Sequence, residues 1–140
     1  MGIKMKLSIL YALLAICGPS YAEGLGRIAQ LTHFIEENEL LLREACNQRA
    51  GELRQVARAD VLCLAGPISN SIDVPSLNDG YDIVYVNSPG GDSIKAMELG
   101  LQIYERDAIV VVDGNCHSAC ANYIIPASRR LYMIDGAVIS

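Results

Sequence analysis

The chain has 140 residues, of which 51% are hydrophobic and 19% charged, and its formal net charge at pH 7 is −5. This length allows one domain at most, and the composition excludes an intrinsically disordered chain. The acidic balance, with no basic tract, argues against a surface for nucleic acid or for anionic membranes.

The first residues have the layout of a secretory signal peptide. Two lysines precede an apolar run over 7–17, and a small-x-small motif ends at Ala22. This pattern predicts a signal peptide over 1–22 that is cleaved after Ala22, and the apolar run is too short to leave a stable membrane anchor. We therefore expect a periplasmic or secreted protein, whose acidity increases when the two lysines are removed.

Four cysteines lie after the signal peptide: Cys46, Cys63, Cys116 and Cys120. An even number of cysteines in an oxidising compartment favours disulfides over metal. Three pairings are open. Cys46 with Cys63 would tie a helix to a strand, and Cys116 lies one helical turn from Cys120. A zinc site that adds His117 is disfavoured because adjacent residues diverge on a helix and no second ligand pair follows, so no metal is predicted.

Residues 25–58 show a helical period and predict an amphipathic helix that packs on a core or on a partner chain. His33 lies on this segment, and we expect it to be a surface histidine. The predicted domains are thus a signal peptide over 1–22, a helical segment over 23–58 and an α/β domain over 59–140. The apolar stripe consists of Ile28, Leu31, Ile35, Leu42, Ala45 and Leu53.

The remaining sequence alternates between buried strands, turns and helices, which is the pattern of a parallel α/β core. A loop rich in Ser, Asn, Asp, Pro and Gly covers 69–80. The all-apolar run at 108–112 is typical of a strand covered on both faces. The predicted strands are 61–65, 82–87, 108–112, 131–134 and 137–139.

Two helices are expected within this core. The first begins at Asp92 or Ser93 as a cap, and the second runs from Ser118 to about Ile125, where Pro126 ends it. The buried face predicted for the first helix consists of Ile94, Met97, Leu101 and Tyr104.

Each of these helices begins in a loop that follows the carboxyl end of a strand, which is where open α/β sheets place their sites. In the first loop, Pro89 fixes one φ angle, whereas Gly90 and Gly91 permit positive φ and the close approach of a substrate backbone. The Gly91 N–H can then point into a cleft. Free N–H groups at a helix start stabilise an anion.

The second loop places Ser118 at the same end of the sheet as Gly91. With Ser118 as nucleophile, the N–H groups of Gly91 and Ala119 would hold the oxyanion of an acyl-transfer reaction. The alternative is that Ser118 only caps the helix. The neighbouring His117 cannot easily reach the Ser118 hydroxyl, so a triad needs a histidine from elsewhere.

These segments resemble the Clp protease proteolytic subunit and the related signal peptide peptidases, from about Val61 to Ser140. The resemblance rests on the Asn-Ser-Pro-Gly-Gly turn and its spacing from the serine-bearing helix start. It implies a ClpP/crotonase fold built of β-β-α units, Ser118 as nucleophile and an oxyanion hole from Gly91 and Ala119. It also implies a peptide backbone bound along Pro89 and Gly90, assembly of several copies, and no cofactor.

The chain departs from the family in three places. Cys116 and Cys120 replace small residues and would brace the nucleophile turn. The family's histidine would fall at or just beyond position 141, with the triad's acid further on. Signal peptide peptidases use a lysine base. Lys95 is the only lysine after the signal peptide, and its position on the helix after the glycine turn gives no reason for it to reach Ser118. We expect little peptidase activity from residues 1–140 alone.

The leading functional hypothesis is therefore a serine peptidase or hydrolase that acts on short or unfolded peptides outside the cytoplasm. One alternative is a module without catalysis that binds peptide or assembles with other chains. Another is an acyl-CoA enzyme of the crotonase type, which export argues against because coenzyme A is a cytosolic cofactor.

Overall fold

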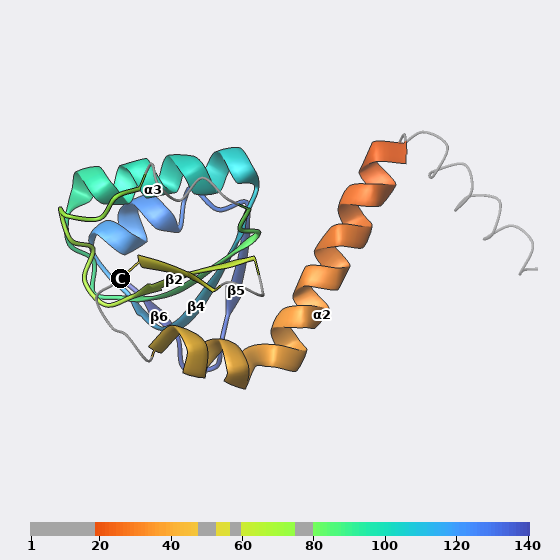
Figure 1. Ribbon diagram of the computed structural model, residues 1–140, viewed down its shortest axis with the longest axis horizontal. Helices are drawn as coiled ribbons and strands as arrows, with labels where there is room; N and C mark the ends of the chain where they lie inside the picture. The colour runs from red at the N-terminus through yellow and green to blue at the C-terminus, as the bar shows by residue number, and fades with distance from the viewer. Residues whose placement is uncertain (1–18, 48–52, 57–59, 75–79) are drawn as a thin grey trace, which may run out of the picture. The chain divides into compact units, whose positions relative to one another are not determined.

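The computed structural model of the chain describes residues 19–47, 53–56, 60–74 and 80–140 (Figure 1). The chain forms two compact units, one that reaches Glu39 and a second from Leu40 to Ser140. The second unit is an α/β structure with a largely parallel sheet, as the sequence predicts.

The sheet has the order β1-β2-β3-β4-β5, and β6 pairs with the end of β4. Only the β1–β2 pair is antiparallel, and all other pairs are parallel. The strands predicted from apolar runs are all present. The bounds are β1 (Leu53–Val56), β2 (Val61–Ala65), β3 (Ile83–Ser88), β4 (Ile109–Cys116), β5 (Arg130–Met133) and β6 (Val138–Ile139).

Helices α3 (Ser93–Arg106) and η1 (Cys120–Ile124) cover one face of this sheet (Figure 1). Alternate strand residues such as Leu62, Val84 and Val110 join the helices in one buried cluster because successive side chains point to opposite faces. The central strands are buried on both faces, which explains their continuous apolar sequence.

Helix α3 begins as predicted, with Asp92 Oδ1 accepting the Lys95 N–H at 2.9 Å. Its predicted buried face is wrong. Ile94 and Leu101 are 62% and 58% exposed, and Met97 and Tyr104 are also exposed. The helix instead buries Ala96, Leu99, Gly100 and Ile103.

Close packing explains this choice of face. A Cβ on Gly100 would lie 2.5 Å from the carbonyl oxygen of Tyr123, which belongs to η1. The buried stripe, which contains Ala96 and Gly100, lets α3 approach η1 closely. The exposed stripe also has a helical period, but its larger side chains could not fit at this distance.

Helix α2 (Pro19–Asn47) is present, but it is shorter than the predicted segment 25–58. Residues 53–56 form β1 instead, because the open edge of β2 offers unpaired backbone groups that a strand can satisfy. At Asn38 the helix has non-helical φ and ψ of −117° and 16°. Its last turns, from Leu40 onward, bury Leu42 and Cys46.

The predicted signal peptide falls mainly on residues 1–18, which lie outside the described residues, and residues 19–22 begin α2. Across the described ranges, no helix combines the length and apolar character needed to cross a membrane.

Candidate active site at the ends of strands β3 and β4

The turn after β3 is held by a buried serine. Ser88 is fully buried, and its Oγ accepts the Gly90 N–H at 3.1 Å. The β3–β4 register shifts between Val86 and Ser88. Gly90 and Gly91 have φ angles of +89° and +144°, so the turn uses the conformational freedom of both glycines.

The Gly91 N–H points away from Ile68, with which the turn forms a parallel bridge. Ile68 donates its N–H to Gly90 O at 2.8 Å, and Asp92 donates to Ile68 O at 2.8 Å. In such a parallel bridge, the residue between the two bonded neighbours directs its own N–H away from the partner strand. A Cβ on Gly91 would also lie 2.3 Å from Ile68 O.

Ser118 lies between β4 and η1 and has a φ angle of +54°, in the left-handed region that residues other than glycine rarely adopt. Its N–H donates to Ser140 O, and its carbonyl oxygen accepts from the Asn122 N–H, both at 2.9 Å. The residue is exposed. Among the described residues, its hydroxyl makes no hydrogen bond, so the alternative of a capping serine has no hydroxyl contact in its favour.

The two turns meet at Gly90. A Cβ there would lie 2.5 Å from His117 O, 2.9 Å from Ser118 Cβ and 3.0 Å from the Ala119 nitrogen. Only glycine fits, and the contact brings the glycine turn directly against the serine turn. No hydrogen bond from the N–H of Gly91 or Ala119 to another residue of the described ranges is found, which leaves both donors available.

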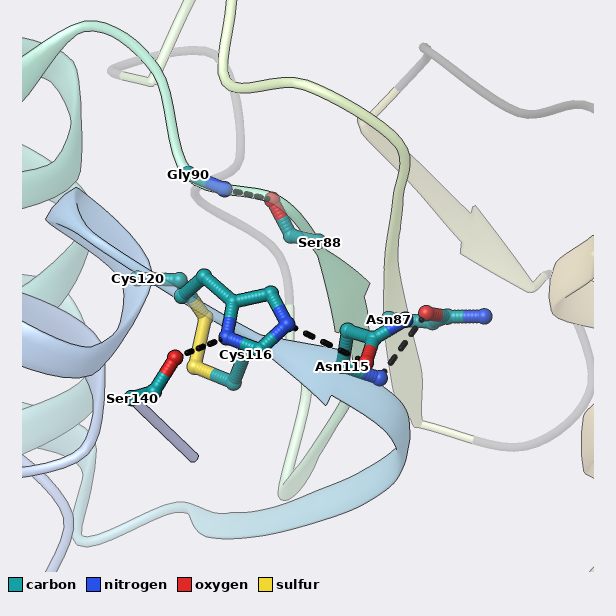
Figure 2. The surroundings of a disulfide bond; sticks show 8 residues. Asn87, Ser88, Gly90, Asn115, Cys116, Cys120 and Ser140 are labelled. Atoms are coloured by element: carbon teal, nitrogen blue, oxygen red, sulfur yellow. Dashed lines mark hydrogen bonds between the residues drawn. A yellow bond between two sulfur atoms is a disulfide. The ribbon is translucent and has the colours of Figure 1, made fainter. Parts of the chain in front are cut away.

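The four cysteines form two disulfides, Cys46–Cys63 and Cys116–Cys120. This is one of the three pairings that the sequence leaves open. Figure 2 shows the second bridge, between Cys116 and Cys120. Cys116 ends β4 and Cys120 begins η1, so this bridge spans the turn that carries Ser118. Two disulfides are compatible with an extracellular protein.

His117 is hydrogen-bonded away from Ser118. Its Nε2 lies 3.1 Å from Asn115 Oδ1, and its Nδ1 bonds Ser140 Oγ. Asn115 in turn donates its N–H to Asn87 Oδ1 at 3.1 Å (Figure 2). These contacts tie the ends of β3, β4 and β6 together and leave His117 no contact with the serine hydroxyl.

The remaining candidate bases also have other partners. Lys95 Nζ lies 2.9 Å from Glu98 Oε2 on α3. His33 lies in the other compact unit, where its Nε2 is 3.2 Å from Glu37 Oε1. No histidine or lysine nitrogen within the described ranges bonds to the Ser118 hydroxyl.

A second polar cluster, which the sequence reasoning missed, joins the end of α2 to the other face of the sheet. Arg43 makes two 2.8 Å hydrogen bonds to the buried Asp113 carboxylate, which also accepts the Tyr85 hydroxyl. Asn47 Nδ2 donates to that hydroxyl at 3.3 Å. The one signal in the sequence is that Asp113 directly follows an all-apolar run.

This cluster shifts two pKa values. Burial raises the pKa of Asp113, but hydrogen bonds from Arg43 and Tyr85 outweigh it and hold the pKa below the ordinary value of 3.8. Burial, and then the hydrogen bond to Asp113, raises the pKa of the Tyr85 phenol well above 10.0. At neutral pH the cluster is therefore a fully paired Arg43–Asp113 ion pair with a neutral tyrosine.

Models of known protein families, curated protein sequences and solved structures were compared with this chain, and none of them matches it. Within the ranges that the structure describes, no group of three or more His, Cys, Asp or Glu is placed to hold a metal ion.

Proposed function

We propose that the protein is a serine peptidase or hydrolase of the ClpP/crotonase type that acts on peptides outside the cytoplasm. The observation that carries this proposal is the turn at Ser118. The exposed hydroxyl of a left-handed residue lies directly against the glycine turn, and among the described residues neither this hydroxyl nor the N–H groups of Gly91 and Ala119 have a hydrogen-bond partner. Backbone strain of this kind persists where the surrounding structure enforces it, and it is concentrated at functional sites.

In the proposed reaction, Ser118 Oγ forms a bond to the substrate carbonyl carbon while a base takes the hydroxyl proton. The carbonyl electron pair moves to its oxygen, which accepts hydrogen bonds from the Gly91 and Ala119 N–H groups. The substrate peptide would bind along the Pro89–Gly90 turn by backbone hydrogen bonds, as an added strand. Collapse of the intermediate then breaks the scissile bond, and the base gives its proton to the leaving amine. The acyl group left on Ser118 is released when water attacks it.

The base is proposed to come from residues that follow Ser140. The carbonyl oxygen of Ser140 accepts the Ser118 N–H at 2.9 Å, so any residues that follow would begin beside the nucleophile. This agrees with the position at or just beyond 141 that the family resemblance implies for a histidine. Residues 1–140 alone would then react slowly, because the oxyanion hole and binding supply only residual catalysis.

The same proposal includes export and self-association. The disulfides and the signal-like residues 1–22 favour a periplasmic or secreted location. We further propose that α2 acts as an amphipathic helix and that several copies of the chain assemble.

A fluorophosphonate probe tests the activity. The 140-residue chain and a form extended by the downstream reading frame are each treated, with Ser118→Ala as the matched control. We expect slow labelling of the first, fast labelling of the second, and none in either Ser118→Ala variant. Equal and rapid Ser118-dependent reaction of the short form would show that the base lies within residues 1–140, and absence of labelling in the extended form would contradict the activity.

One observation favours a second candidate, a module that binds or assembles without catalysis. The apolar residues Ile94, Met97, Leu101 and Tyr104 form an exposed stripe on α3, and stripes of this kind commonly mark interaction surfaces. Under this candidate, Ser118→Ala would leave the biological effect of the protein intact, whereas the hydrolase proposal requires its loss.

A further inference from the structure

We propose that the Cys116–Cys120 disulfide positions Ser118 for reaction by holding this residue in its left-handed conformation. The inference rests on the proposed function and adds to it a pair of residues that never touch the substrate. Both cysteines are fully buried, whereas Ser118 is exposed, so their effect on the reaction passes through the backbone of residues 117–119.

The left-handed conformation of Ser118 needs an external cause. Asp107, which has a similar φ of +55°, caps α3, and its N–H bonds the carbonyl oxygens of Ile103 and Tyr104. Ser118 does not end a helix in this way, and no side-chain hydrogen bond of its own within the described ranges holds it in this conformation. A right-handed Ser118 would extend the following helix by one residue and would redirect both the hydroxyl and the Ala119 N–H.

The bridge fixes both ends of the turn. Cys116 pairs with Ser88 in the sheet, and its carbonyl oxygen accepts the Ser140 N–H at 3.1 Å. Cys120 donates its N–H to His117 O at 3.0 Å at the start of η1. With only three residues between two anchored and covalently joined cysteines, the turn has few alternative conformations. The noncovalent contacts of Ser118 with Ser140 and Asn122 then select the left-handed one.

The chain offers a matched control in its other disulfide. Cys46–Cys63 joins α2 to β2, and Cys63 alternates with Leu62 and Leu64, which face α3. The control bridge therefore lies on the opposite face of the sheet from Cys116–Cys120. Its removal tests the general effect of losing a disulfide without touching the serine turn.

The experiment compares wild type with Cys116→Ala/Cys120→Ala, with the volume-restoring Cys116→Val/Cys120→Ala, and with Cys46→Ala/Cys63→Ala. Each is studied below its own unfolding midpoint, as checked by circular dichroism. The first readout is the rate of fluorophosphonate labelling at Ser118 in the extended form. The second is amide hydrogen exchange at Ser118 and Asn122 in the 140-residue chain, which reports the turn without any need for activity.

Loss of Cys116–Cys120 should slow labelling at least about tenfold and speed exchange at both amides by a similar factor. The control should change neither. Unchanged labelling and exchange in both Cys116/Cys120 variants would overturn the inference, as would an equal loss in the control. If wild type is not labelled but exchange rises only without Cys116–Cys120, the proposed function fails while the bridge still determines the serine turn.

Discussion

The two disulfides lie in polar surroundings of opposite character. Around Cys46–Cys63, Arg43, Asp113 and Tyr85 satisfy one another by hydrogen bonds. Around Cys116–Cys120, the Ser118 hydroxyl is exposed, and no partner is found for it among the described residues. Satisfied polar groups stabilise a fold, whereas backbone strain is concentrated at functional sites. One sheet therefore carries a satisfied polar cluster of Arg43, Asp113 and Tyr85 on one face and a candidate site at Ser118 on the other.

The largest expected effect is on the reactivity of the serine turn. Gly90→Ala would place a Cβ 2.5 Å from His117 O and 2.9 Å from Ser118 Cβ at a φ of +89°. The backbone of both turns must shift, so we expect Ser118 labelling to fall by about a hundredfold or more. Mass spectrometry of the adduct measures this rate. Gly136→Ala is the control, because φ there is +85° and a Cβ meets nothing within 4 Å. Labelling of Gly90→Ala at the wild-type rate would remove the glycine turn from the site.

Removal of the structural disulfide should lower stability without touching reactivity. Its cysteines are 17 residues apart, so Cys46→Ala/Cys63→Ala should reduce the free energy of unfolding by about 3 kcal/mol. The separation of Cys116 and Cys120 is only 4, for which the same relation gives about 2 kcal/mol. Urea unfolding measures both. The reverse order of the two losses would contradict the assignment of Cys46–Cys63 as the main structural bridge.

The sequence predicts the central strands and the location of both loops, because apolar runs and glycine-rich turns are local signals. It does not predict which apolar stripe of α3 is buried, because the stripe with Ile94 and the stripe with Leu99 both repeat apolar residues at a helical period. Only the close approach at Gly100 decides between the two stripes. Strand β1 also depends on an edge supplied elsewhere in the chain. The Arg43–Asp113 pair joins residues 70 positions apart, so neither residue signals the other.

The stability of the protein should also depend on the cluster of Arg43, Asp113 and Tyr85. Asp113→Asn removes the negative charge that accepts hydrogen bonds from Arg43 and from the Tyr85 hydroxyl. The free energy of unfolding should fall by about 2 kcal/mol. Ser118 labelling should not change, because the cluster lies on the opposite face from the serine turn. A drop in labelling at temperatures where the variant is folded would show that the two regions are coupled.

Acid should reduce the stabilisation that Asp113 gives through this cluster. The folded pKa of Asp113 lies below its ordinary value of 3.8, so its stabilisation is fully present above that pH and is lost as pH falls through the folded pKa. The raised pKa of Tyr85 has the opposite effect on the pH dependence of stability. Its stabilisation is present below pH 10.0 and is lost as the pH rises above 10.0. Thermal unfolding between pH 5 and about 2 should show a smaller decrease in Asp113→Asn than in wild type. Equal slopes would mean that Asp113 carries no such stabilisation.

The smallest effect is expected at the buried hydroxyl behind the glycine turn. Ser88→Ala removes the acceptor of the Gly90 N–H and should cost about 1 kcal/mol, with a reduction of labelling of up to about tenfold. Parallel urea unfolding and probe kinetics separate these two losses. A stability loss with no kinetic change would limit Ser88 to a structural role.

The most direct test of the central claim is a crystal structure of the extended chain after reaction with a fluorophosphonate. We predict a covalent bond to Ser118 Oγ, with the phosphonyl oxygen about 2.7–3.1 Å from both the Gly91 and the Ala119 nitrogen atoms. An adduct whose oxygen faces solvent, or a probe attached to another serine, would contradict the claim that these two turns form one oxyanion site.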